Sequence, residues 1–198
     1  MPALAARQAH RAYDAPVAIQ AGTYQLGPGD DATVQVKTYR EGIAAKAGHD
    51  LVIEVTSWQA TVEVAEDRAQ SKVELSAEPG SLQVRDGLRG VKPLTDKDRA
   101  EIRKNIDEKI LGREPISFRS TALELGEQGN LSGRGELQMA GSTRPIEVEL
   151  SVGSDGRITG TVTLTQSEWG IKPYRGLMGA LKVRDSLDVV IDARLPSG

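Results

Sequence analysis

Apolar residues alternate with polar ones along most of the chain, a pattern typical of strands with one buried face. The alternation begins near residue 22 and recurs through residues 32–39, 51–64, 73–77 and 82–84. After a helical segment it resumes in residues 116–125, 131–139, 145–152, 158–165 and 181–195. Turn-forming runs such as Gly27-Pro28-Gly29-Asp30 separate the stretches. About nine strands at hairpin spacing predict an antiparallel, up-and-down sheet.

The apolar phase changes once inside a continuous stretch. Leu51, Ile53 and Val55 occupy odd positions, whereas Trp58 and Ala60 occupy even ones. This change of phase predicts a bulge or bend in one long strand. A sheet of about eight strands can close on itself, and a barrel of that size can hold one small ligand. We therefore expect an all-β, up-and-down barrel of about eight strands.

Residues 95–112 follow a helical period instead. Thr95 suits an N-cap, Asp98 can complete a capping box with it, and Gly112 suits a left-handed C-cap. Isoleucines recur at intervals of four and form one apolar stripe, which consists of Ile102, Ile106 and Ile110. We expect one amphipathic helix, about residues 95–111, in a connection between strands. Its stripe would cover one opening or flank of the barrel, as a fixed plug or as a moving lid.

Length and charge limit the remaining possibilities. A chain of 198 residues predicts one barrel domain, residues 21–198, preceded by a mobile arm, residues 1–20. The formal net charge of −3, with both signs interleaved, argues against a nucleic-acid partner. No stretch has the length of a transmembrane helix, and the first residues do not form a secretory signal. These two observations predict a cytoplasmic protein.

Few residues could support catalysis or bind a metal. The chain has no cysteine, and its only histidines are His10 and His49. His49 and the adjacent Asp50 are too few ligands for zinc. His49 suits a structural hydrogen bond at the start of a strand, and the alternative is contact with a ligand at the barrel mouth. Without a phosphate loop or a nucleophile motif, we expect no enzyme, no metal and no cofactor.

Residues 165–185 combine apolar side chains with several glycines and a proline, so they suit neither a regular strand nor a helix. The apolar members are Trp169, Ile171, Tyr174, Leu177, Met178 and Leu181, and the cations among them are Lys172, Arg175, Lys182 and Arg184. The segment could fold over one end of the barrel as a plug. It could also form a rim that holds an apolar ligand, with cations near an anionic head group. The two roles can coexist.

Six motifs in order resemble those of the YceI-like family. They are Gly48-His49-Asp50-Leu51, Ile116-Ser117-Phe118-Arg119-Ser120-Thr121, Gly133-Arg134-Gly135-Glu136-Leu137, Gly141-Ser142-Thr143-Arg144-Pro145-Ile146, Thr165-Gln166-Ser167-Glu168-Trp169-Gly170-Ile171 and Val183-Arg184-Asp185-Ser186-Leu187. The turn at residues 141–145 and the strand that contains Phe118 are the most informative. The resemblance covers roughly residues 21–195 and implies a lipocalin-like antiparallel barrel with a helix in one connection.

The resemblance also implies a function. Members of this bacterial family bind long isoprenoid chains, such as isoprenoid quinones or polyprenyl diphosphates, in an apolar interior, and many are periplasmic or secreted. We expect binding, carriage or sequestration of such a lipid. The alternative is a non-catalytic stress-response or protein-interaction module whose barrel is filled by its own side chains, and a homodimer also stays open. The expected ligand contacts are His49, Phe118, Trp169, Ile171, Lys172, Tyr174, Arg175, Leu177 and Met178.

Overall fold

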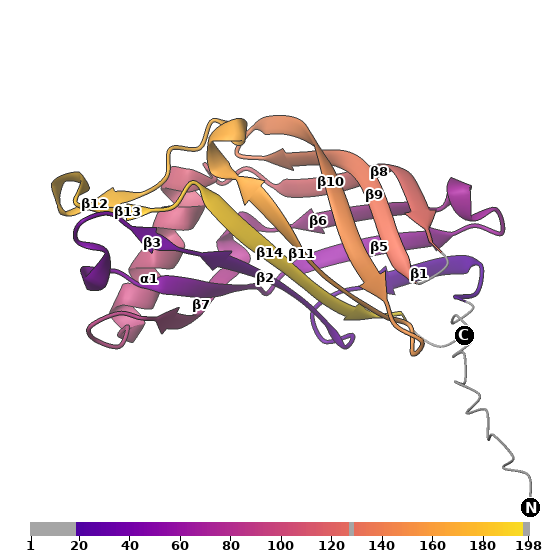
Figure 1. Cartoon of the computed structure of the whole chain (residues 1–198), viewed down its shortest axis with the longest axis horizontal. Coiled ribbons are helices and arrows are strands. Elements are labelled where there is room, and N and C mark those ends of the chain that lie inside the picture. The colour runs from indigo at the N-terminus through magenta and orange to yellow at the C-terminus, as the bar shows by residue number, and fades with distance from the viewer. Residues whose placement is uncertain (1–18, 127–128, 196–198) are drawn as a thin grey trace, which may run out of the picture.

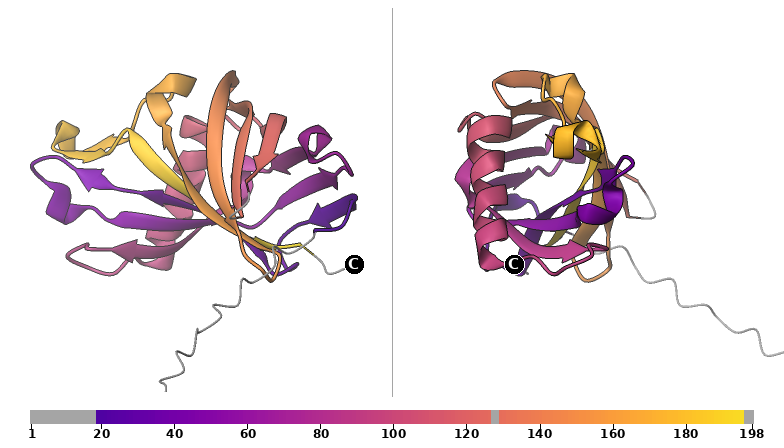
Figure 2. Two further views of the ribbon diagram at one scale, coloured as in Figure 1. Left: turned by 45° about the vertical axis from the view of Figure 1, so that its right-hand side comes forward. Right: turned by 90° about the vertical axis from the view of Figure 1, so that its left-hand side faces the viewer.

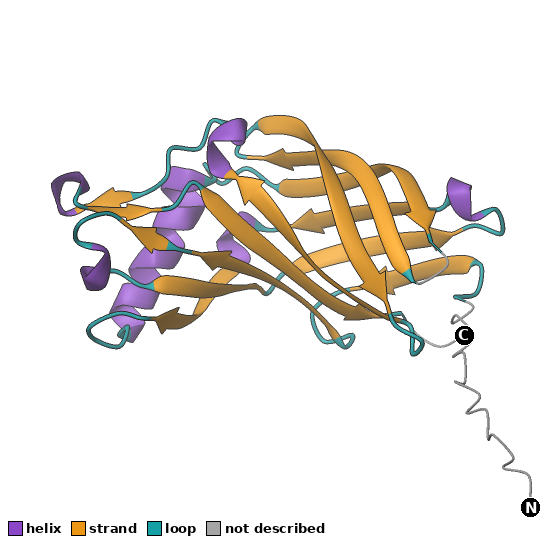
Figure 3. Cartoon of the chain, viewed as in Figure 1, coloured by secondary structure: helices purple, strands orange, loops and turns teal. Residues whose placement is uncertain are grey.

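A strongly curled antiparallel β-sheet with one helix against its flank makes up most of the protein (Figure 1, Figure 3). The computed structural model describes residues 19–126 and 129–195. Residues 1–18, which form most of the expected N-terminal arm, lie outside the described residues. The prediction of an all-β chain with one helix in a connection is confirmed.

The large sheet contains eleven of the described strands, in the order β1-β5-β6-β8-β9-β10-β11-β14-β2-β4-β7, and β12-β13-β3 form a small second sheet. All neighbours are antiparallel. The strands are β1 (Gly22–Leu26), β2 (Ala32–Thr38), β3 (Arg40–Glu41), β4 (Asp50–Val55), β5 (Trp58–Val64), β6 (Lys72–Ala77), β7 (Leu82–Leu88), β8 (Ile116–Leu125), β9 (Asn130–Met139), β10 (Ser142–Val152), β11 (Arg157–Thr165), β12 (Arg175–Gly176), β13 (Leu181–Val183) and β14 (Ser186–Arg194).

The bend predicted from the phase change lies between β4 and β5. β4 ends at Val55 and β5 begins at Trp58, yet both pair with the segment that follows them in the sequence, which consists of β6 and β7. Val55 faces Leu82 of β7, and Trp58 faces Ala77 of β6. A short 3₁₀-helix, η3 (Pro79–Ser81), makes the matching bend between β6 and β7. The sheet has more strands than the expected eight or so because bends divide long segments of extended chain.

Local turn chemistry explains where neighbouring strands reverse. Between β9 and β10 the chain turns at Ala140 and Gly141, whose φ angles are +49° and +73°. Two successive residues at positive φ match the right-handed twist of a hairpin, and glycine adopts that conformation at low cost. Ser142 consequently faces Met139 directly, which sets the register of the longest ladder in the sheet.

The helical segment begins as expected and ends differently. α1 (Asp96–Asn105) has Thr95 as its N-cap in a complete capping box with Asp98. The next turn, η4 (Ile106–Ile110), is π-helical, so the single α-helix expected over residues 95–112 is shorter than predicted. Gly112 has a φ angle of +63°, the left-handed conformation expected of it. Seen end-on, α1 runs along one side of the curled strands (Figure 2, right).

A second short helix fills a break in the sheet. β10 and β11 pair only through Leu150–Val152 and Ile158–Gly160 and separate beyond that point. Near the far end of β10, the 3₁₀-helix η5 (Gln166–Trp169) contacts the strand, and the Arg144 Nε donates to the Glu168 carbonyl at 2.9 Å. Trp169, only 2% exposed, donates its indole N–H to the Leu137 carbonyl at 3.0 Å. Trp169 thus belongs to the wall of the sheet.

The remaining helical segments are short 3₁₀ turns: η1 (Ala45–Ala47), η2 (Arg68–Gln70) and η6 (Leu177–Gly179). Among the described residues, no helix has both the length and the apolar character that a membrane span requires.

Candidate functional site: an apolar cavity inside the curled sheet

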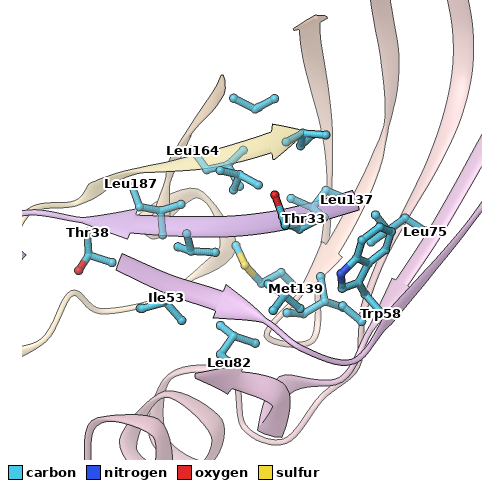
Figure 4. Close-up of a pocket in the computed structure, with 18 of the residues that line it drawn as sticks. Thr33, Thr38, Ile53, Trp58, Leu75, Leu82, Leu137, Met139, Leu164 and Leu187 are labelled. Carbon is cyan, nitrogen blue, oxygen red and sulfur yellow. The ribbon is translucent and has the colours of Figure 1, made fainter. Parts of the chain in front are cut away.

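The curled sheet encloses a cavity of about 990 Å³. That volume is at the upper end of the range for small-molecule sites, about 300–1,000 Å³. Aliphatic side chains from β1, β2, β4–β6, β8–β11, β14 and α1 provide most of its lining. The close-up shows Ile53 of β4, Trp58 of β5, Leu75 of β6, and Leu137 and Met139 of β9 projecting into this space (Figure 4). The sheet interior is therefore not filled by its own side chains.

Two rows of facing residues form much of the wall, because directly opposed residues of antiparallel strands point to the same side. One row crosses β11, β14, β2 and β4 and consists of Val162, Val189, Val36 and Ile53. The other crosses β1, β5, β6, β8 and β9 and consists of Leu26, Ala60, Leu75, Phe118 and Leu137. Every member of both rows lines the cavity. The alternation seen in the sequence thus becomes an apolar inner surface.

The predicted isoleucine stripe completes this surface on the helical side. Ile102, Ile106 and Ile110 are half-buried, pack against the core and line the cavity. Leu111, which follows them, is 3% exposed. The π-helical turn ends in a hydrogen bond from the Leu111 N–H to the Ile106 carbonyl at 2.8 Å. It brings Ile106, Ile110 and Leu111 onto the side that faces the strands.

Several polar groups lie at one end of the cavity, which we call the mouth. His49, Lys92, Tyr174 and Lys182 all line the cavity there. The His49 Nε2 lies 2.6 Å from the Lys92 carbonyl oxygen, so the ring is held by the loop between β7 and α1. His49 therefore has both features expected of it as alternatives, a structural hydrogen bond and a position at the cavity edge.

A buried carboxylate holds the mouth loops together. Asp50, 7% exposed, accepts a hydrogen bond from the Arg40 backbone N–H at 2.9 Å and forms an ion pair with Arg89 at 3.2 Å. The Arg40 guanidinium in turn donates to the carbonyls of Ala45 and Gly48, at 3.0 and 3.1 Å. The charge of Asp50 is thus compensated, and two loops of the mouth, residues 42–49 and 87–94, are tied to β3 and to the start of β4.

A second polar cluster connects Tyr39, which lies between β2 and β3, to strands β11 and β14. The Tyr39 hydroxyl donates to Asp188 at 2.6 Å, and the Thr163 hydroxyl donates to the same carboxylate at 2.7 Å. These hydrogen bonds hold the pKa of Asp188 below its ordinary value, and the bond to Asp188 raises the pKa of Tyr39. The guanidinium of Arg184 lies 5.3 Å from the centre of the Tyr39 ring, within cation–π range.

The residues expected to contact a ligand divide into two groups. His49, Phe118, Ile171 and Tyr174 line the cavity, as do the three isoleucines of the helix. Trp169, Lys172, Arg175, Leu177 and Met178 do not, and Leu177 and Met178 project into solvent. Trp169 is directed into the wall because its indole N–H must be paired when buried, and the Leu137 carbonyl provides the partner.

Sequence reasoning missed several lining residues. Trp58 lines the cavity, whereas the other tryptophan does not. The even position of Trp58 in the alternation after the bend already indicated an inward side chain, since Ala60 and Val62 also lie at even positions. Of the four cations expected at the rim, Lys182 lines the cavity, whereas Lys172, Arg175 and Arg184 do not. Arg40, Arg68 and Lys92 also line it, and no periodic pattern marked these three. Within residues 19–126 and 129–195, no cluster of three or more metal-ligating side chains occurs.

A strongly curled antiparallel sheet that surrounds an apolar cavity defines a lipocalin-like class of protein. The family model described as a YceI-like domain matches residues 24–195. The chain therefore belongs to the YceI-like family, which confirms the resemblance noted in the sequence.

Solved structures agree with this assignment at the level of the fold. BcnA of Burkholderia cenocepacia superposes with a TM-score of 0.60 at 13% identity, over 81% of this chain and 94% of that one. The YCEI protein of Campylobacter jejuni gives a TM-score of 0.50 at 11% identity, over 72% of this chain and 82% of that one. A search of curated proteins found no match.

Proposed function

We propose that the protein binds one long apolar lipid inside the curled sheet, a polyisoprenoid such as an isoprenoid quinone or a polyprenyl diphosphate, and carries or sequesters it without chemical change. One observation supports this most directly: the interior is an aliphatic cavity of about 990 Å³ rather than a packed core. Protein interiors are normally packed as densely as organic crystals, so a space of this size requires an explanation. A bound apolar chain provides one.

The shape of the cavity favours a long ligand. Its lining includes both Ile116 and Leu125, the two ends of the ten-residue strand β8. At about 3.3 Å per residue, that strand spans roughly 30 Å. Each methylene transferred from water to such a surface contributes about 0.8 kcal/mol, so a chain of ten would gain about 8 kcal/mol before the cost of ordering it. A short ligand would leave most of this surface unused.

We further infer that the sheet functions as a closed, eight-stranded barrel. β4 with β5 and β6 with β7 each form one bent strand, and β1 with β2 count as one more, because both pair with the β4–β5 segment. Counted in this way, the strands form a ring in which β14 meets β2. Closure of the ring supports ligand binding because it shields a buried lipid chain from water on the strand side, while α1 covers the flank of β7.

The mouth suits a polar head group. Lys92 and Lys182 supply cations there, and Tyr174 supplies a hydroxyl, whereas the wall rows farther inside are aliphatic or aromatic. A diphosphate would favour these lysines by charge, and quinone oxygens could accept hydrogen bonds from the same groups. Arg68, between β5 and β6, also lines the cavity, but more of the lining cations lie at the mouth, namely Arg40, Lys92 and Lys182. This balance supports an orientation in which the chain enters the barrel and the head group stays at the mouth.

Quenching of tryptophan fluorescence tests the proposal. Trp58 lines the cavity, whereas Trp169 lies in the wall. Because quinones quench nearby indoles, we expect a long-chain quinone to quench the wild type in a saturable titration. The matched control is Trp58→Phe, in which most of the saturable quenching should disappear while the ligand still binds by equilibrium dialysis. Equal quenching in both proteins would contradict binding inside the barrel.

Organic extraction of protein purified from its own host, followed by mass spectrometry, identifies the natural ligand. Recovery of a polyisoprenoid in a constant ratio to protein is the expected result. If the protein is empty and takes up neither quinone nor polyprenyl diphosphate, the non-catalytic interaction module becomes the better description. Fractionation of the same cells tests the predicted cytoplasmic location, and sedimentation tests the homodimer.

A further inference from the structure

The mouth end of the barrel carries apolar side chains that point away from the protein. Ile43 and Met178 are fully exposed, at 101% and 107% of their reference areas, and Leu177 is 59% exposed. They sit at the tips of two neighbouring loops, one after β3 and one at η6 (Figure 1). We propose that these tips insert into an anionic lipid bilayer, so that the barrel docks on a membrane with its mouth toward the lipid.

The two loops form one preorganised platform. The Ala44 N–H donates to the Ala180 carbonyl at 3.0 Å, which joins the loop of Ile43 to the loop of Met178. Gly42 is required for this approach, because a Cβ there would lie 2.5 Å from the Ala180 oxygen. Below the tips, β3 pairs with β13, and β13 pairs with β12. The apolar tips are thus held side by side on a small sheet, which lowers the ordering cost of insertion.

The backbone beneath Met178 is strained. Leu177 and Met178 both have positive φ angles, +49° and +55°, and neither is a glycine. The Ala180 N–H donates to the Leu177 carbonyl at 3.1 Å, so Met178 and Gly179 are the central residues of a turn. With φ angles of +55° and +88°, the turn is type I′, for which Asn-Gly is the preferred pair. A methionine here gives a less stable turn and an exposed apolar side chain, so folding does not account for it.

Charge identifies the surface that the tips would meet. The three mouth segments, residues 42–49, 87–94 and 171–184, contain seven lysines and arginines and no aspartate or glutamate, although the whole chain has a formal net charge of −3. Within the described residues, only Arg89 of these seven takes part in an ion pair, with Asp50. The other six include Lys46, Lys172, Arg175 and Lys182, of which Lys182 faces Glu41 across the β3–β13 pair. Their excess over acidic residues in these segments would attract anionic head groups.

A membrane fits this arrangement better than a folded protein partner does. The exposed apolar groups lie on projecting loop tips, which can enter a bilayer, whereas protein interfaces place them in a broad complementary surface. Tyr174, 47% exposed, stands at the same end, and tyrosine is enriched at the level of lipid head groups. The mouth lining includes Tyr174 and Lys182, so a docked barrel would open directly onto the lipid. Entry of a lipid from the membrane into the barrel rests on the proposed function, whereas docking itself does not require a ligand.

Vesicle flotation with the full chain tests docking. The vesicles are phosphatidylcholine alone, or equal parts of phosphatidylcholine and phosphatidylglycerol, at low and at physiological salt. We expect flotation with the anionic vesicles and at least tenfold weaker binding to neutral ones. Lys172→Glu should weaken binding by more than about fivefold, the effect of removing one cation near an anionic surface. The matched control is Lys72→Glu at the far end of the β5–β6 hairpin, which should bind as the wild type does.

The decisive variant is Met178→Asn, which creates the preferred Asn-Gly turn. It should match or exceed the wild type in thermal stability, retain its lipid in the extraction experiment, and lose at least tenfold in binding to anionic vesicles. Met178→Leu should bind normally. Wild-type binding by Met178→Asn, or no flotation of the wild type, would overturn docking whatever the barrel contains. A concentration-dependent dimer abolished by Met178→Asn, without vesicle binding, would overturn it in favour of a second copy of the chain.

Discussion

Filling the cavity from one wall position should separate ligand binding from stability. Val189 on β14 is half-buried and lines the cavity between Val36 and Val162. Val189→Phe adds four carbon atoms to a side chain that points inward. If they displace a similar number of ligand methylenes, at about 0.8 kcal/mol each, binding weakens by about 3 kcal/mol, on the order of 100-fold. The added carbons enter an apolar space, so the free energy of unfolding should change by less than about 1 kcal/mol.

The neighbouring residue provides a matched control. Val190 lies on the same strand and is also half-buried, but it belongs to the opposite face and does not line the cavity. Titration with a long-chain quinone, followed by Trp58 fluorescence and confirmed by equilibrium dialysis, measures both variants. Val189→Phe should lose affinity while Val190→Phe keeps it. Equal affinities, or a greater loss in Val190→Phe, would refute the reasoning that the ligand occupies the interior, and urea unfolding of each variant shows whether the fold is intact.

Three further substitutions test the supports of the cavity. Thr95→Ala removes the N-cap of α1 and should lower the free energy of unfolding in urea by about 1 kcal/mol at neutral pH. Hydrogen bonds from Thr95 hold the pKa of Asp98 below its ordinary value, so the part of the stabilisation due to that carboxylate is lost as pH falls through the lowered pKa. The bond from the Asp98 N–H to the Thr95 hydroxyl remains, so the gap between wild type and variant should narrow in acid without closing; a constant gap would contradict this. Asp50→Ala should cost about 2 kcal/mol in thermal unfolding, because the hydrogen bond and ion pairs that join the mouth loops are lost. Gly135→Ala should cost roughly 1–3 kcal/mol, because its methyl group would overlap Phe118 in the wall, and an unchanged melting temperature would be the contrary result.

Local patterns in the sequence were sufficient to predict the individual strands, the bend between β4 and β5, and the start of the helix. Thr95 and Asp98 form the predicted capping box because both partners lie within four residues of each other. Successive residues of a strand point to opposite faces, so the phase change before Trp58 marks the place where the strand bends. The isoleucines of the helix share one face for the same kind of reason, a fixed local period. The family motifs added the curled architecture, which no single strand could specify.

The location of individual side chains depended on contacts between distant segments. Trp169 and Trp58 have the same side chain, yet Trp169 donates a hydrogen bond to the Leu137 carbonyl in the wall, whereas Trp58 lines the cavity. Met178 and Leu177 resemble cavity residues in composition, but a left-handed turn directs them outward. Such outcomes follow from which hydrogen bonds and loop closures are available after folding, and a local pattern does not contain them.

The sequence by itself determined that this chain forms amphipathic strands and one capped helix, because periods of two and of nearly four residues are local properties of the backbone. Only the tertiary structure decided that the apolar faces surround a cavity of about 990 Å³ instead of meeting in a packed core. The physical reason is that an aliphatic strand face is equally stable against another side chain or against a lipid chain. The choice between them depends on the distance between walls, which the pairing and bending of the whole sheet set.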